Sequence, residues 1–239
     1  SQVVDADGAF DDSSATQPQY TYTRSGSYRV QLRVTDPLGA SSAATVTITV
    51  NNTPPTAFMH TPVAGTTWKV GDVISFAGSA SDPQQGSLPA SALKWELILH
   101  HCPSNCHTHP VQAFTGVASG SFSAPDHEYP SYLELRLTAT DSGGLTNTKS
   151  IRLDPQTVGL KFETTPTGLK LTVNGSVSTA PFTRRVIVGS RNSLSAISPQ
   201  TKGTKTYLFV SWSDRGAQTH DIIAPATATT YTARYHKRP

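Results

Sequence analysis

Strict alternation of apolar and polar residues is the feature that most limits what this chain can fold into. In SYRVQLRVTD, the residues Tyr28, Val30, Leu32 and Val34 alternate with polar neighbours, which is typical of a strand that buries one face. Similar runs recur along the chain, and no segment of helical length carries a sustained apolar period of three to four residues. The pattern therefore predicts an all-β protein.

Breaks rich in proline and glycine divide the 239 residues into three expected units. Adjacent prolines in NNTPPT lack backbone donors and end any strand ladder, and DPQTVG forms the second break. The expected units are a partial domain over 1–52, an immunoglobulin-like sandwich over 53–155 and a different small sandwich over 156–239. LRVTDPLGASSAATVTITV and LRLTATDSGGLTNTKSIRL share a strand, a glycine-containing corner and a Thr/Ser-rich strand, which indicates tandem copies of one sandwich topology.

The composition favours a secreted β-protein and argues against several classes of partner. Charged residues make up 15% of the chain, below the roughly 25% usual for soluble domains. The 19 Lys and Arg residues are scattered and the net charge is only +3, so no nucleic-acid partner is expected. No stretch approaches the roughly 18 apolar residues of a membrane span. We expect an extracellular monomer, and because Ser1 opens no signal segment, a mature or excised piece.

The segment LHHCPSNCHTHPVQ, residues 99–112, holds both cysteines and four of the eight histidines. A disulfide between Cys102 and Cys106 is expected from the oxidising setting that the composition suggests. On a chain-entropy basis it would remove only about 2 kcal/mol of unfolded-state freedom, so its role would be to stiffen the turn. The alternative is a zinc site made from both thiolates and two histidines.

The histidines themselves predict a zinc or copper site. Neutral imidazoles bind both metals, and the spacing His107-x-His109 places two rings on one side of a strand. In the expected topology, the loop APDHEYPSY with Asp126 lies at the same end of the sandwich as the histidine turn. The alternative is a solvated turn whose histidines bond to backbone or to each other. The candidate metal ligands are His100, His101, His107, His109, His127 and Glu128.

A calcium site is a further candidate near the N-terminus, in DADGAFDD. The spacing of Asp5, Asp7 and Asp11 around Gly8, with Asp12 as a further carboxylate, offers the ring of oxygens that Ca²⁺ prefers, although the bidentate Glu of a full helix-loop-helix site is missing. A solvated acidic turn near the terminus is the alternative.

Carbohydrate binding would need exposed aromatic faces that stack on pyranose rings. Trp68, Tyr129 and Tyr132 are the candidates, whereas Trp95 and Trp212 share faces with aliphatic residues and are expected in the cores. No nucleophile elbow, H-E-x-x-H helix, phosphate-binding glycine loop or dinucleotide fingerprint is present in the sequence. Catalysis is therefore not expected.

A family resemblance adds a context. The segment PQYTYTRSGSYRVQLRVTDPLGASSAATVTITV resembles the second half of a PKD domain, an immunoglobulin-like module of secreted bacterial enzymes and surface proteins, with the match specific over residues 5–50. The middle unit resembles the PKD-like domain that follows it in actinobacterial accessory regions, particularly those of glucose/sorbosone-type, PQQ-dependent sugar dehydrogenases. SWSDRGAQTHDIIAPATATTYTARY resembles a terminal β-module of such chains.

The resemblance implies a non-catalytic accessory region of a secreted carbohydrate-active or sugar-oxidising enzyme, cut inside its first module. Its partners would be a polysaccharide or cell-surface glycan and an upstream catalytic domain, which tethering would hold near its substrate. Two other hypotheses stay open. One is a metal-binding module centred on the histidine turn, and the other is a structural spacer or adhesion segment.

Overall fold

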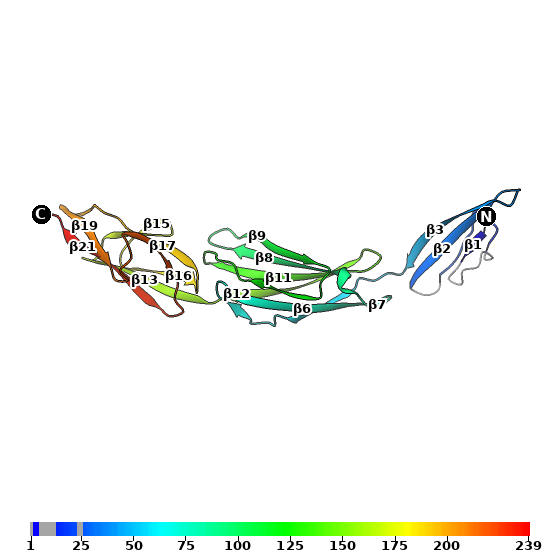
Figure 1. Ribbon diagram of the computed structural model, residues 1–239, viewed down its shortest axis with the longest axis horizontal. Helices are drawn as coiled ribbons and strands as arrows, with labels where there is room; N and C mark the ends of the chain where they lie inside the picture. The colour runs from blue at the N-terminus through cyan, green and yellow to red at the C-terminus, as the bar shows by residue number, and fades with distance from the viewer. Residues whose placement is uncertain (1, 5–12, 23–25) are drawn as a thin grey trace.

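The computed structural model describes residues 2–4, 13–22 and 26–239 and arranges them as three β-rich modules in a row, with the termini at opposite ends (Figure 1). The described elements are strands apart from one short 3₁₀ helix. The predicted all-β class with tandem β-sandwiches is confirmed. No helix in the described part of the chain has the length and apolar character needed to cross a membrane.

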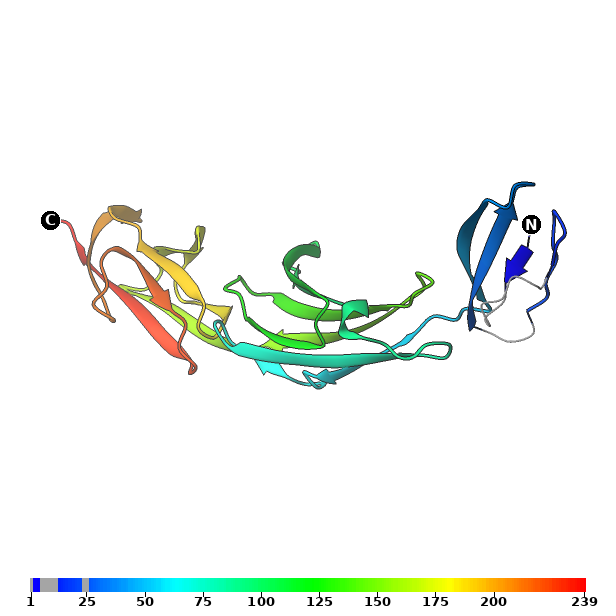
Figure 2. The same ribbon diagram turned by 45° about the vertical axis from the view of Figure 1, so that its right-hand side comes forward.

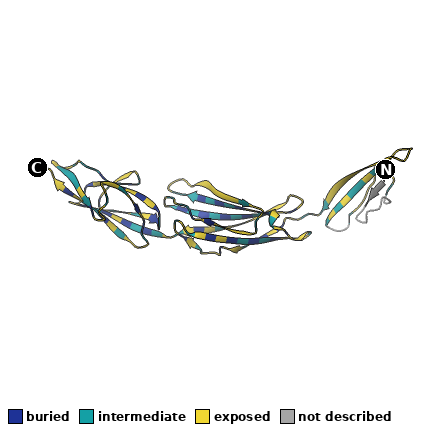
Figure 3. Cartoon of the chain, in the orientation of Figure 1, coloured by how far each residue is buried: buried dark blue, intermediate teal, exposed yellow. Residues whose placement is uncertain are grey.

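The first module is a single antiparallel sheet in the order β1-β2-β3. Its strands are β1 (Gln2–Val4), β2 (Gly26–Thr35) and β3 (Ser41–Val50). The alternation correctly located β2, but the expectation that one face is buried is wrong, because Leu32 is 41% and Val34 is 55% exposed. Among the described residues, no second sheet covers this face, and Figure 3 shows exposed and half-buried residues where the other modules have dark-blue stripes.

The middle module is a two-sheet sandwich, with β10-β6-β4 (and β7 beside β6) facing β5-β12-β11-β8-β9. Its elements are β4 (Thr56–Thr61), β5 (Thr67–Trp68), β6 (Val73–Asp82), β7 (Gly86–Ser87), η1 (Ala90–Ala92), β8 (Leu93–His101), β9 (His107–Thr115), β10 (Ser119–Ser123), β11 (Ser131–Thr140) and β12 (Thr146–Pro155).

Period-two patterning builds the core of the middle module. Along β8, the side chains of Leu93, Trp95, Leu97 and Leu99 are all at most 2% exposed, and the residues between them are not buried. The indole of Trp95 requires Gly78 on the opposite sheet, because a Cβ there would lie 2.9 Å from the Trp95 ring, inside van der Waals contact. As predicted from the sequence, Trp95 is a core residue.

The C-terminal module is a second sandwich, of β16-β13-β21-β19-β18 against β15-β14-β17-β20. Its strands are β13 (Thr157–Thr165), β14 (Lys170–Val173), β15 (Ser176–Thr179), β16 (Phe182–Ile187), β17 (Arg191–Ala196), β18 (Gln200–Lys202), β19 (Lys205–Trp212), β20 (Thr219–Ile223) and β21 (Thr229–Lys237). Its core includes Phe162, Leu171 and Trp212, so the prediction that Trp212 is buried is confirmed.

A single residue, Gln156, separates the last strand of the middle module from the first strand of the C-terminal module. Its backbone N–H donates to the Trp68 carbonyl, and its own carbonyl accepts from Val188, at 2.6 and 2.9 Å. The Val70 N–H donates back to the Val188 carbonyl at 3.0 Å. Ile187, from the C-terminal module, is fully buried in the core of the middle module. The two sandwiches are therefore joined by paired backbone and a shared core, and Figure 2 shows that they follow one another directly along the chain.

Side chains of the middle module hold the connection between the first and middle modules. Asn52 Nδ2 donates to Asp141 Oδ2 at 2.8 Å, and the Thr53 backbone N–H donates to Gln84 Oε1 at 3.2 Å. This connection uses polar contacts and prolines, whereas the other junction uses strand pairing and apolar burial.

We expect Ile187→Ala to destabilise the middle and C-terminal modules together by about 2–5 kcal/mol, because it opens a cavity at their shared core. Ile223→Ala is the matched control, since Ile223 is 64% exposed and surface truncations change stability by about 0.5 kcal/mol at most. Guanidinium unfolding followed by tryptophan fluorescence measures both variants. Equal unfolding midpoints for the two variants would show that Ile187 does not couple the modules.

Candidate metal centre

The β8–β9 hairpin brings three histidines onto one face of the sheet. In the antiparallel register, His101 lies opposite His107 and His109 lies opposite Leu99. Side chains two apart on a strand share a face, so His101 continues the apolar row that ends with the buried Leu99. The core-facing side of this sheet thus ends in imidazoles at the tip of the hairpin.

The imidazoles lie close enough to share one ion. Each of His101, His107 and His109 offers a ring nitrogen, and these three atoms all lie within 4.8 Å of one another. The ring centroids of His101 and His107 are 5.1 Å apart, and those of His107 and His109 are 4.8 Å apart. His101 is half-buried and the other two are exposed, so the cluster is open to an ion from solvent.

A disulfide between Cys102 and Cys106 closes the tip of the hairpin. This confirms the predicted pairing and excludes the alternative in which both thiolates bind zinc, since a disulfide sulfur carries no thiolate charge. The Cys102 backbone N–H donates to the Pro130 carbonyl at 2.9 Å. The cross-linked tip is thereby tied to the loop between β10 and β11.

That loop places His127 against the cluster, 4.6 Å from His101 and 5.5 Å from His109 between ring centroids. Its Nδ1 lies 3.2 Å from the Glu128 carbonyl oxygen, a contact in which Nδ1 donates and which leaves Nε2 unprotonated in the neutral ring. Asp126 Oδ2 accepts from the Arg191 backbone N–H at 3.0 Å. The loop therefore touches both the histidines and the C-terminal module.

Burial lowers the pKa of His101, and the neighbouring His127 and His107 rings lower it further, against a smaller opposing effect of Glu128. A lowered pKa keeps this imidazole neutral at physiological pH, and the neutral ring is the form that binds metals.

His100 does not join this cluster. It alternates with His101 and lies on the outer face of the sheet, where its Nε2 is 2.8 Å from Glu134 Oε2. Its ring stacks on Tyr132 with centroids 4.5 Å apart. The prediction of His100 as a metal ligand is therefore corrected, because a period of two sends adjacent strand residues to opposite faces.

The outer-face carboxylate of Glu134 is held in its charged form. Burial acts to raise its pKa, but hydrogen bonds from His100, Arg136 and Ser150 and the charge of Arg136 together outweigh burial, so the pKa of Glu134 lies below its ordinary value. The Arg136 guanidinium donates to both carboxylate oxygens, at 3.1 and 3.2 Å.

The three aromatic residues predicted to bind carbohydrate differ in burial and in the contacts of their rings. Trp68 is fully buried and its Nε1 donates to the Leu153 carbonyl, so its prediction as a sugar platform is wrong. Tyr132 lies between His100 and the Arg152 guanidinium, which approaches its ring centroid to 3.7 Å from the neighbouring strand on the other side. Neither face of its ring is free. Only Tyr129, which is 39% exposed, remains able to stack on a ligand.

The calcium candidates Asp5, Asp7, Asp11 and Asp12 lie outside the described residues. Calcium binding there stays a prediction from the sequence.

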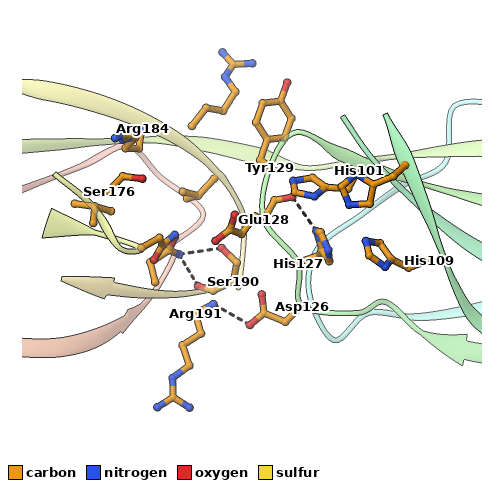
Figure 4. A pocket seen from close by; sticks show the side chains of 16 residues that line it. His101, His109, Asp126, His127, Glu128, Tyr129, Ser176, Arg184, Ser190 and Arg191 are labelled. Carbon is orange, nitrogen blue, oxygen red and sulfur yellow. Dashed lines mark hydrogen bonds between the residues drawn. The ribbon is translucent and has the colours of Figure 1, made fainter. Parts of the chain in front are cut away.

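The histidines open into a cavity of about 580 Å³ between the middle and C-terminal modules. Figure 4 shows the histidines on one side, with Ser176, Arg184, Ser190 and Arg191 on the other and with Glu128 and Tyr129 between them. Sequence reasoning missed the residues of the C-terminal module, because nothing in their local pattern indicates that they face a turn more than sixty positions away.

Comparison with known families finds a match for one part of the chain. Residues 6–50 match the sequence model of the PKD domain family, which supports the resemblance of the first module to that immunoglobulin-like fold. No curated protein matches the chain. The relation to sugar dehydrogenases stays a prediction.

Two solved structures share a distant likeness. The major pilin subunit of Bacillus cereus is 10% identical with a TM-score of 0.27, covering 99% of this chain and 94% of the pilin. A Ca²⁺-stabilized adhesin with which an Antarctic bacterium binds ice is 11% identical with a TM-score of 0.19, covering 86% of this chain and 57% of that protein. At these TM-scores neither likeness bears on function.

The lowered pKa of Glu134 predicts a loss of stability in acid. A carboxyl group with a depressed pKa in the folded state contributes stability that is present above its unfolded pKa and is lost as the pH falls through the folded pKa. We expect the difference in unfolding free energy between the native protein and Glu134→Gln to shrink as the pH falls from 5 to about 3. Urea unfolding at several pH values measures it, and a difference that stays constant over that range would contradict the assignment.

Proposed function

We propose that this chain binds a divalent transition metal ion, Zn²⁺ or Cu²⁺, through His101, His107 and His109. The observation that carries the proposal is the mutual approach of three imidazole nitrogens to within 4.8 Å. Imidazole is a ligand of both metals, and three histidines with a fourth position left for another ligand form a known type of zinc site.

The spacing of the three nitrogens is compatible with one ion. Nitrogen ligands about 2.0–2.1 Å from a tetrahedral zinc lie about 3.3 Å apart, whereas the three donor atoms lie within 4.8 Å of one another, so side-chain rotations would bring them together around it. The β8–β9 backbone pairing and the Cys102–Cys106 disulfide fix the strands that carry them. His127 stands beside the three ligands, with its ring centroid 4.6 Å from that of His101.

The setting of the site supports a structural rather than a catalytic role. A match to the PKD family is consistent with a module inside a larger protein, and a disulfide is consistent with an extracellular location. The two sandwiches that flank the site share backbone pairing and a core. The chain is then a non-catalytic accessory or adhesive part of that larger protein, with the metal beside the junction of these two sandwiches.

The earlier hypothesis of polysaccharide binding next to a catalytic domain retains one supporting observation. Tyr129 is exposed and lines the cavity beside the histidines. Any glycan contact by the predicted aromatic residues would therefore be made by Tyr129, beside the metal centre.

We expect the metal-free protein to bind one Zn²⁺ or Cu²⁺ per chain, and His107→Gln to weaken that affinity by at least about tenfold. Even partners outside the first ligand shell are worth about 10–100-fold in metal affinity, and His107 is exposed, so its substitution leaves the core intact. Isothermal titration calorimetry measures both, after treatment with a chelator.

Two variants serve as controls for this experiment. His100→Gln removes the adjacent imidazole on the opposite sheet face, and His236→Gln removes an exposed histidine of β21. Both should retain the affinity of the native protein. Binding that is absent from the native protein, or that is lost equally in all three variants, would refute the histidine site.

A further inference from the structure

The cavity beside the histidines is built by two modules that are joined by paired backbone. Its middle-module wall is the histidine cluster with the loop that carries His127 and Tyr129, and its opposite wall comes from the β14–β15 turn and from β16 and β17. The Asp126–Arg191 contact and the paired backbone around Gln156 hold these walls together. A volume of about 580 Å³ lies within the range of small-ligand sites, about 300–1,000 Å³.

The opposite wall carries positive charge that the protein does not neutralise. Arg191 is paired with Asp221, with Nη2 2.6 Å from Oδ2. Arg184 and Arg185, by contrast, form no ion pair with any residue in the described ranges. The Nε of Arg184 is buried and lacks a hydrogen-bond partner among the described residues, although its Nη2 donates to Ser178. A buried donor without a partner costs free energy unless a ligand or water satisfies it.

Rigid polar groups complete that wall. Asn174 Nδ2 donates to Asn192 Oδ1 at 2.8 Å, and Asn192 in turn donates to Ser190. Asn174 adopts a left-handed backbone conformation with φ of 47°, as an Asn-Gly hairpin turn requires. Amide and hydroxyl groups fixed in this way suit the hydroxyl groups of a sugar, and Tyr129 at the same cavity offers a ring face for stacking.

We infer that the cavity binds an acidic saccharide, a uronate-containing glycan whose carboxylate completes the coordination of the metal ion held by His101, His107 and His109. This inference rests on the metal binding proposed above. The three histidines line the cavity, so a ligand in the cavity lies beside the ion that they hold. The ion and the arginines attract the carboxylate, and the polar wall and Tyr129 receive the sugar ring.

The acidic groups of the cavity do not cancel this attraction. Asp126 is occupied by the Arg191 backbone N–H, and Glu128 is the other carboxylate that lines the cavity. Arg184, Arg185 and Arg191 line the cavity with these two carboxylates, and Arg191 is already paired with Asp221. The two arginines without an ion pair and a divalent ion together outweigh the two carboxylates, so the loaded cavity has a net positive charge. A neutral glycan gains nothing from that charge, which makes the carboxylate the group that discriminates.

The test uses trigalacturonate as the probe and calorimetry as the measurement, on the whole chain. Zinc affinity is measured first, and the glycan is then titrated into zinc-loaded and metal-free protein. We expect trigalacturonate to bind the zinc-loaded protein at least tenfold more tightly than the metal-free protein. Its methyl ester, which lacks the charge, and acetate, which lacks the sugar, should each bind at least tenfold more weakly.

Arginine variants test the opposite wall. Arg185→Gln should weaken trigalacturonate binding at least fivefold with zinc affinity unchanged, and Arg234→Gln, at an exposed position of β21 outside the cavity, should change neither. Arg185 is exposed, so its substitution preserves the fold. Arg184→Gln is the second variant, with circular dichroism to verify that it folds.

The outcomes separate the two proposals. Zinc binding without trigalacturonate binding, or equal binding of the methyl ester, overturns the acidic-saccharide inference and leaves the metal site standing. Equal binding of acetate also overturns it, since a carboxylate alone would then account for the interaction. If neither Zn²⁺ nor Cu²⁺ binds, the metal site fails first and the inference fails with it.

Discussion

The backbone pairing across the boundary at Gln156 is the constraint on which the shape of the histidine cavity depends. Only one residue lies between β12 and β13, so no flexible linker separates the two sandwiches. The Val70–Val188 hydrogen bond and the burial of Ile187 convert the boundary into continuous structure. Because the walls of the cavity come from both sandwiches, its shape is a property of this boundary rather than of either module.

The histidine cluster forms because the alternation of side chains along β8 continues beyond the last core residue of that strand. The inner face of β8 is apolar from Leu93 to Leu99, and the same periodicity then delivers His101. The hairpin register places His107 opposite it, and the disulfide limits fraying of the tip. The imidazoles are thus positioned by the same pattern that builds the core, and the loop that carries His127 crosses between the two sheets, from β10 to β11.

Much of this architecture can be predicted from the sequence, because local alternation of apolar and polar residues indicates a strand. The pattern located β2, β8, β11 and β21, and the buried environments of Trp95 and Trp212. The disulfide followed from cysteine count and composition. The errors have different physical causes. Trp68 lies in a two-residue strand that is too short to show a period, and His100 is next to His101 in sequence but lies on the opposite face of the sheet. Arg184 and Arg185 reach the cavity only through the packing of one module on the next, which no local pattern encodes.

The difference between the two inter-module connections has a mechanical consequence. When such a chain is anchored at both ends and stretched, tension passes straight from β12 into β13, where strand pairing and apolar packing resist elongation. The segment around Asn52 is tied down by side-chain hydrogen bonds such as the one to Asp141, so it is the compliant joint. Strain would therefore be absorbed near the first module, and the histidine cavity would keep its dimensions under load.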